Sequence, residues 1–105
     1  MSGKVLLEES AVNDLILIRS FLVNRGMAKK KVDEMVELIV RKAVFQLSHF
    51  PFSGVSFQEK YHQSLLEPIR EYFINPYYFY YLIENNKNVF IIRIRHFKQK
   101  ILNQF

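Results

Sequence analysis

Residues 75–83 read NPYYFYYLI, and this stretch decides the expected fold. Aromatic and β-branched residues favour strands, so the run predicts a strand over residues 77–84. Because side chains alternate along a strand, Tyr77, Phe79, Tyr81 and Ile83 are expected on one face and Tyr78, Tyr80 and Leu82 on the other. One face must carry the packing helices. The outward half, Tyr78 and Tyr80, is then a candidate surface for base stacking or protein contact.

Two further strands flank this one, over residues 69–74 and 89–96. Asn85-Asn86-Lys87-Asn88 predicts a hairpin turn, because asparagine tolerates a positive φ. In the last strand, simple alternation places Phe90, Ile92 and Ile94 on one face with His96. The same alternation directs Arg93 and Arg95 to the opposite face.

The first half of the chain has helical periodicity. A short strand is expected over residues 4–8, followed by Ser10 as a helix N-cap. The first helix carries an apolar stripe and stops at Asn24-Arg25-Gly26. The second runs from about residue 28 to residue 48. The two stripes consist of Ala11, Leu15, Ile18 and Leu22, and of Val32, Val36, Ile39, Ala43 and Leu47.

The connection between these helices is only a few residues long, so they should form an antiparallel hairpin. Phe50-Pro51-Phe52-Ser53-Gly54 ends the second helix, and a polar loop is expected from there to about Leu66. The predicted fold is a single α+β domain over residues 1–105. In it, the N-terminal strand and the two-helix antiparallel hairpin pack on a small antiparallel β-sheet.

The amino-acid composition excludes some kinds of functional site. The 105 residues are half hydrophobic and include no cysteine, so disulfides and thiolate chemistry are excluded. The N-terminus lacks the apolar core of a signal peptide, and no apolar run approaches the ~20 residues of a membrane span. A soluble, cytoplasmic protein with no membrane contact is expected. The three histidines lack metal-ligand spacing, so neither a metal nor another cofactor is expected.

Charge points to a macromolecular partner. The net charge is +5, and no acidic residue follows Glu84. The basic residues of this end are Lys87, Arg93, Arg95, Lys98 and Lys100. A positive end on a small domain favours nucleic acid or an acidic protein as partner.

Four motifs in order resemble the RelE/ParE superfamily of toxins from bacterial type II toxin–antitoxin modules. SAVNDLILIRSFL resembles the "A..DL..I" pattern of the first helix, and LSHFPFSG the "L...P..G" exit from the second. IREYFINPYYFYYLI resembles "R.....PYR..Y", and IIRIRHFKQK the closing "ILRV.H.R.D". The last two place the chain nearest the ParE-like, plasmid-stabilisation branch. They match it through Arg70, Pro76, Tyr77, Tyr81, Arg93 and His96.

This resemblance implies a toxin that binds and inhibits DNA gyrase and is neutralised by a cognate antitoxin. The implied contact residues for the target or the antitoxin are Arg70, Tyr78, Tyr80, Arg93, Arg95, Lys98 and Lys100. Antitoxins of this type usually fold a disordered segment onto the toxin. Either a homodimer or a toxin–antitoxin hetero-oligomer is compatible with the resemblance.

The alternative is a RelE/YoeB-like endonuclease that cuts mRNA on the ribosome. That pattern places Glu59 at the catalytic carboxylate and His96 at the histidine, but its central arginine position falls on Tyr78. Tyr78 cannot supply the positive charge that stabilises the transition state. A third alternative is a non-toxic relic that keeps the fold and antitoxin binding.

Overall fold

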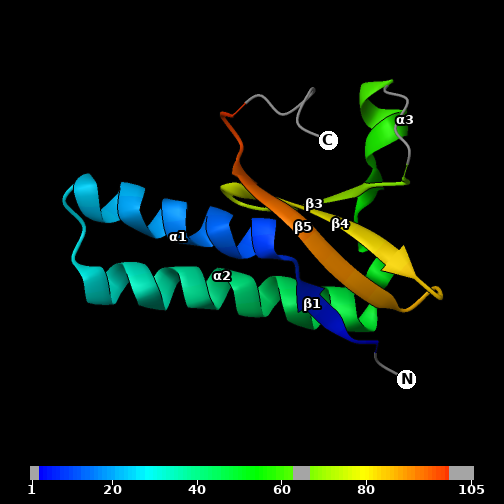
Figure 1. Cartoon of the computed structure of the whole chain (residues 1–105), viewed down its shortest axis with the longest axis horizontal. Helices are drawn as coiled ribbons and strands as arrows, with labels where there is room; N and C mark the ends of the chain where they lie inside the picture. The colour runs from blue at the N-terminus through cyan, green and yellow to red at the C-terminus, as the bar shows by residue number, and fades with distance from the viewer. Residues whose placement is uncertain (1–2, 63–66, 100–105) are drawn as a thin grey trace.

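The computed structural model describes residues 3–62 and 67–99 and has an α+β architecture. Its elements, in order, are β1 (Val5–Leu7), α1 (Glu9–Asn24), α2 (Lys29–His49), the 3-10 turn η1 (Pro51–Ser53), β2 (Val55–Ser56), α3 (Phe57–Tyr61), β3 (Arg70–Ile74), β4 (Tyr77–Glu84) and β5 (Asn88–His96). The α1–α2 hairpin covers one face of the sheet, and α3 lies away from the hairpin beside β2 and β3 (Figure 1). The predicted fold class is confirmed. None of the described helices is long and apolar enough to span a membrane.

The sheet is mixed, with strand order β1-β5-β4-β3-β2. Strands β2 to β5 pair antiparallel, as predicted for the last three, whereas β1 joins β5 in parallel. Asn85 and Asn86 form the β4–β5 turn with φ of 55° and 59°, which confirms the predicted hairpin. The sheet is therefore larger than expected, because both β1 and β2 extend it.

The core lies between the hairpin and one face of β4 and β5. The predicted stripes of both helices enter it, together with the odd-numbered aromatic residues of β4. Its buried members are Ala11, Leu15, Val32, Val36, Ala43, Leu47, Tyr77, Phe79, Tyr81, Val89, Ile91 and Ile94. The predicted two faces of β4 are confirmed, since Tyr80 belongs instead to a smaller cluster with Phe57 and Ile69 on the opposite side.

The simple alternation predicted for β5 is wrong. A bulge lies opposite the step from Tyr80 to Tyr81, where Tyr80 pairs with Arg93 but Tyr81 pairs with Ile91. The extra residue, Ile92, packs on the face of the smaller cluster, while Ile91 and Ile94 are buried under the hairpin. A β-bulge inserts one unpaired residue and so reverses the parity of the strand. Phe90 and Ile92 consequently do not share a face with Ile94 and His96.

Two predictions about local structure are also wrong. Ser10 is not the N-cap of α1, because the helix begins at Glu9 after Glu8, and the Ser10 hydroxyl donates to the Ile92 carbonyl at 2.5 Å. The segment after Gly54 is not simply a loop, because it forms β2 and α3. Ser56 caps α3 by accepting from the Glu59 N–H at 3.4 Å. The Ser-x-x-Glu spacing is a helix-start signal present in the sequence.

Arg70 fixes the corner that follows α2. Its guanidinium donates to the Gly54 carbonyl through both Nε (3.1 Å) and Nη2 (2.5 Å) and lies 5.3 Å from the centre of the Phe52 ring. From the same side, the Tyr81 hydroxyl donates to the Pro51 carbonyl at 2.6 Å and accepts from the Gly54 N–H at 2.9 Å. These contacts hold η1 against the sheet, so Arg70 has a structural role in this chain.

We predict that Gly54→Ala lowers the free energy of unfolding by about 2 kcal/mol, the typical cost of overpacking a filled site. A Cβ at this position would lie 2.7 Å from both the Glu71 carbonyl oxygen and the Tyr81 hydroxyl, so the corner would have to shift. Urea denaturation of the variant measures the loss. Ser20→Ala, on the exposed surface of α1, is the control and should change stability by less than about 0.5 kcal/mol. Equal stability of the two variants would contradict the close packing at Gly54.

Candidate functional site

Asp14 organises the basic residues of the last strand. The residue is only 4% exposed. It accepts from Arg93 Nε at 3.0 Å and Nη2 at 3.3 Å, from Arg95 Nη1 at 2.5 Å, and from the backbone N–H of Ile94 at 2.9 Å. Charge-assisted hydrogen bonds of this kind are stronger than neutral ones. One carboxylate on α1 therefore holds two predicted contact residues in a fixed arrangement.

Arg93 and Arg95 reach Asp14 around the edge of the sheet. By register they pair with Tyr80 and Tyr78, on the face opposite the hairpin, as the sequence predicts. Their side chains are 27% and 13% exposed, so part of each side chain is accessible. Their role as target or antitoxin contacts stays a prediction, and the structure adds a fold-stabilising role.

The end of β5 presents an aromatic and basic corner. The His96 ring packs edge-on against the Tyr77 ring, with centroids 5.6 Å apart, and at a tilt of 33° against the Phe97 ring, with centroids 4.7 Å apart. Its Nδ1 accepts from the Lys98 N–H at 3.2 Å. Phe97 and Lys98 are exposed, and the Lys98 ammonium lies 5.7 Å from the centre of the Phe97 ring. Lys100, also predicted as a contact residue, lies outside the described residues.

On the opposite face, α3 encloses a buried carboxylate that sequence reasoning missed. Glu71 is 3% exposed and accepts hydrogen bonds from the hydroxyls of Tyr61 and Tyr80, each at 2.7 Å, and from the Lys60 ammonium at 2.5 Å. Burial and the hydrogen bond to Glu71 raise the pKa of both tyrosines. Burial alone would lower the pKa of Lys60, but its bonds to Glu71 and Tyr61 outweigh that effect and raise the pKa to about 12.

This network corrects the expectation of an outward-facing Tyr80. The side chain is 1% exposed because α3 covers it, with the Phe57 ring edge-on at 5.8 Å. A partner can reach Tyr80 only by displacing α3. Tyr78 is half-buried and remains accessible.

Tyr78 lies on the same face of the sheet as Tyr80 but is only half-buried. Its ring packs against Phe73 at 4.6 Å, and Phe73 is 45% exposed. The Lys60 ammonium lies 5.1 Å from the centre of the Tyr78 ring, within cation–π range. Aromatic faces beside a cation can stack on bases or bind an interface side chain, so the arrangement is compatible with the predicted contact role of Tyr78.

The residues of the endonuclease alternative are not brought together. Glu59 is exposed on α3, on the side of Tyr80, whereas His96 pairs with Tyr77 on the hairpin side of the sheet. No contact joins Glu59 to His96 within the described residues. Lys60 lies over the Tyr78 ring, but its ammonium is already bonded to Glu71. Acid–base catalysis needs its groups within hydrogen-bond reach of one substrate, and this pair does not provide that geometry.

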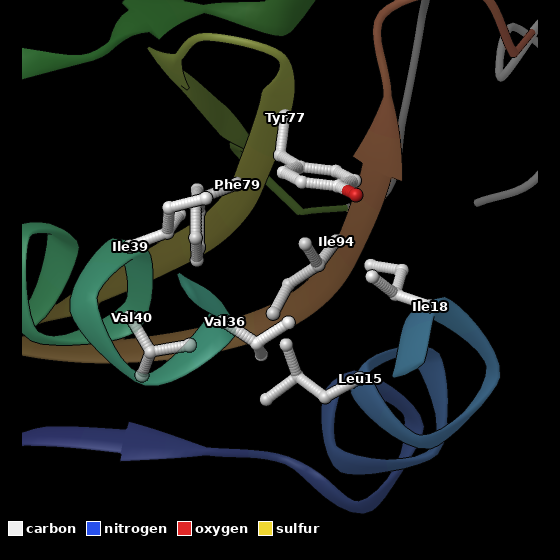
Figure 2. A pocket seen from close by; sticks show the side chains of 8 residues that line it. All are labelled: Leu15, Ile18, Val36, Ile39, Val40, Tyr77, Phe79 and Ile94. Atoms are coloured by element: carbon white, nitrogen blue, oxygen red, sulfur yellow. The ribbon is translucent and has the colours of Figure 1, made fainter. Parts of the chain in front are cut away.

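Figure 2 shows a crevice where the hairpin meets β4 and β5. Its lining is apolar apart from the Tyr77 hydroxyl, and burial raises the pKa of that phenol. The cavity volume is about 10 Å³, near the minimum for one water molecule. The crevice is therefore part of the packed core rather than a small-molecule site. Its lining residues are Leu15, Ile18, Val36, Ile39, Val40, Tyr77, Phe79 and Ile94.

Solved structures share this arrangement of elements. A chain of the chromosomal ParDE toxin–antitoxin system from P. aeruginosa superposes with a TM-score of 0.68 and 16% identity, covering 90% of this chain and 96% of that chain. A chain of the toxin–antitoxin complex RelBE2 from Mycobacterium tuberculosis gives a TM-score of 0.63 and 18% identity, covering 91% and 92%. These likenesses concern the fold, which is that of the RelE/ParE superfamily.

The family follows from the sequence match. The family model of the ParE toxin of the type II toxin–antitoxin system parDE matches residues 5–101. The chain therefore belongs to the ParE toxin family, as its motifs predicted. No curated protein sequence matches it significantly.

We predict that Asp14→Asn lowers the free energy of unfolding by about 2 kcal/mol, since charge-assisted bonds to two arginines are lost. An asparagine oxygen still accepts from Ile94, so the fold should be retained. Asp33→Asn is the matched control, because the Asp33 side chain is 46% exposed and pairs with Arg19 and Lys29 at 3.6 and 3.4 Å. It should cost less than about 1 kcal/mol. Denaturation midpoints that fall equally would contradict the organising role of Asp14.

Stability should fall in alkaline solution. Tyr61 and Tyr80 have folded pKa values above 10.0, and Lys60 has a folded pKa of about 12 against 10.5. A group whose pKa is raised by folding stabilises the protein at pH values below its unfolded pKa. This stabilisation is lost as the pH rises through the folded pKa of the group. The free energy of unfolding should therefore decline from about pH 10 upward, with little dependence on these groups below pH 9. The free energy of unfolding should decline less steeply with pH in Tyr80→Phe, which lacks the titrating hydroxyl, than in Tyr72→Phe. The second variant is the control, because it removes a hydroxyl on the hairpin face of the sheet.

Proposed function

We propose that this member of the ParE toxin family binds DNA gyrase and inhibits it, and that a cognate antitoxin neutralises it. Family membership provides the general role, a toxin of a type II toxin–antitoxin system. Gyrase as the target follows from resemblance to the ParE-like branch. Inhibition by binding requires a contact surface and no assembled catalytic group.

The separation of Glu59 from His96 is the observation that carries this proposal. With Tyr78 at the position where the endonuclease branch has an arginine, the phosphate-stabilising charge is also missing. Losing one preorganised charge stabiliser typically lowers a rate by about 10²–10³. A binding mechanism needs none of these groups, so it agrees better with the side chains present.

The proposed contact surface is the end of β5 with its aromatic and basic corner. Arg93 and Arg95 are fixed by Asp14, and Phe97 and Lys98 are exposed beyond them. Rigid side chains lose little conformational entropy on binding, and exposed cations steer association with an acidic surface. Tyr78 extends the surface on the side of Arg95, its partner in the strand register.

We predict that the purified protein inhibits supercoiling of relaxed plasmid by gyrase, with or without trapping cleaved DNA. Lys98→Glu should raise the concentration for half-inhibition roughly tenfold, or about 1.4 kcal/mol, through like-charge repulsion. Lys98 is exposed and makes no side-chain ion pair in the described structure, so the fold should persist. Lys42→Glu on α2 is the matched control and should inhibit like the parent protein.

Uninhibited supercoiling at a large excess of folded protein would overturn the gyrase proposal. Cleavage of mRNA on translating ribosomes, lost in His96→Ala, would establish the endonuclease alternative. Absence of both activities, with antitoxin binding retained, would identify a non-toxic relic.

A further inference from the structure

Strand β1 forms one edge of the sheet, beside β5 (Figure 1). The Lys4 carbonyl and the Glu8 N–H are hydrogen-bonded to β5, at 2.8 and 2.9 Å. Successive residues of a strand direct their backbone groups to opposite sides, so Val5 and Leu7 direct theirs away from β5. None of these four N–H and C=O groups has a hydrogen bond within residues 3–62 and 67–99. The outer side of β1 is therefore an open edge.

The side chains of this edge are arranged symmetrically about Leu6. Lys4, Leu6 and Glu8 are exposed, Leu6 by 53%. They share the face of the sheet opposite the hairpin, because Val5 and Leu7 pack against the core under the hairpin. Neither Lys4 nor Glu8 makes an ion pair in the part of the chain that the structure describes. Residues 4–8, KVLLE, thus carry opposite charges at equal distances from a central leucine.

We propose that β1 is the interface of a homodimer, in which the β1 strands of two copies pair antiparallel about a twofold axis at Leu6. Val5 of one copy then lies opposite Leu7 of the other, and the two residues exchange a pair of hydrogen bonds. Symmetry repeats this pair on the other side of the axis, so every outward backbone group of both strands is bonded. Leu6 needs no hydrogen bond across the axis, because its backbone groups face β5.

The charges favour a second copy as the occupant of this edge. In the proposed register, Lys4 of each copy lies opposite Glu8 of the other, on the face that carries the two Leu6 side chains. Two ion pairs therefore flank one apolar contact, and opposite charges across neighbouring strands are stabilising. Shifting the register by two residues would place Lys4 opposite Leu6 and lose both ion pairs. The charge pattern therefore specifies the register as well as the partner.

Strand β1 also lacks the usual protection against edge pairing. Natural sheets commonly place a charged residue or a proline within an exposed edge strand. The centre of β1 is instead an exposed leucine, and the charges lie only at its ends. The opposite edge of the sheet, β2, has two residues and leads directly into α3. Of the two edges, β1 is the one suited to accept a strand.

The dimer would leave the proposed gyrase contacts accessible. Strand β1 pairs with residues 89–91, at the beginning of β5, whereas the aromatic and basic corner lies at the end of β5. Each dimer would then present two such corners. An interface built on one short strand is small, so we expect a dissociation constant on the order of 10 μM.

Sedimentation velocity of the purified protein at increasing concentration measures this dimer. Leu6→Lys should raise the dissociation constant about tenfold or more, because it places two like charges beside the twofold axis. Leu38→Lys is the matched control, since Leu38 is 54% exposed on α2, and this variant should dimerise like the parent protein.

Exchange of the two charges tests the register. Lys4→Glu should weaken the dimer about tenfold, and Lys4→Glu combined with Glu8→Lys should restore it, because the ion pairs form again with reversed polarity. Circular dichroism checks that each variant is folded. In the parent protein, amide hydrogen exchange at Val5 and Leu7 should slow as the concentration rises. Exchange at Leu6, whose N–H faces β5, should change little.

A parent protein that stays monomeric at about twenty times the expected dissociation constant would overturn the proposal. A dimer that Leu6→Lys weakens no more than Leu38→Lys, or that the exchanged charges fail to restore, would overturn it as well. Protection of the Val5 and Leu7 amides only in a complex with the antitoxin would assign the edge to that partner instead. None of these measurements involves gyrase, so their outcome is independent of the proposed function.

Discussion

The hydrogen bonds and ion pairs between the Asp14 carboxylate and β5 are the interactions on which the rest of this structure depends. Strand β5 is nine residues long, but β1 pairs with only Val89, Phe90 and Ile91, so most of the β5 edge has no neighbouring strand. The chain leaves β1 and enters α1 almost at once, and the first two turns of that helix supply the missing partners. Ser10 and Asp14 bond to backbone groups that a strand would otherwise satisfy. The same contacts set α1 on the sheet and orient Arg93 and Arg95.

The two faces of the sheet are stabilised by different kinds of interaction. Under the hairpin the core is apolar and contributes through burial of hydrophobic area. Under α3 a buried glutamate is satisfied by two phenols and an ammonium. A buried carboxylate is costly unless every partner is in place, so α3 must sit in one position. That requirement explains why a helix of only five residues covers Tyr80 completely, while Tyr78 stays half-buried and Phe73 exposed.

The fold alone does not separate the two mechanisms considered for this superfamily. Chains from a ParDE system and from a RelBE2 complex superpose on this structure almost equally well, with sequence identities of 16% and 18%. The distinction lies in side chains, because catalysis needs several groups around one reacting phosphate and inhibition by binding needs only a complementary surface. Here the acidic and imidazole groups lie on different sides of the sheet, and the cations near the β5 edge are engaged with Asp14. This difference in side-chain placement is the basis on which we propose a contact surface.

The sequence by itself determined the helix hairpin, the three long strands and the two faces of β4. Each depends on periodicity, a local property that repeats over many residues. It also determined the family, because four motifs in the correct order extend along nearly the whole chain. Glu71 and Asp14 gave a weaker indication of their roles, because each is a single acid within an apolar segment. A buried acid implies that cationic or hydrogen-bond-donating partners are present, but it does not specify which residues they are.

Only the tertiary structure decided which groups meet. The bulge at Ile92 reversed the parity of β5, and no local signal marks the residue at which a register shifts. Burial of Tyr80 depended on α3, and the pairing of Arg93 and Arg95 with Asp14 joined segments about eighty residues apart. Periodicity specifies the direction of a side chain relative to its own element. Its partner is specified by how elements pack, because long-range contacts depend on the positions of all the elements together.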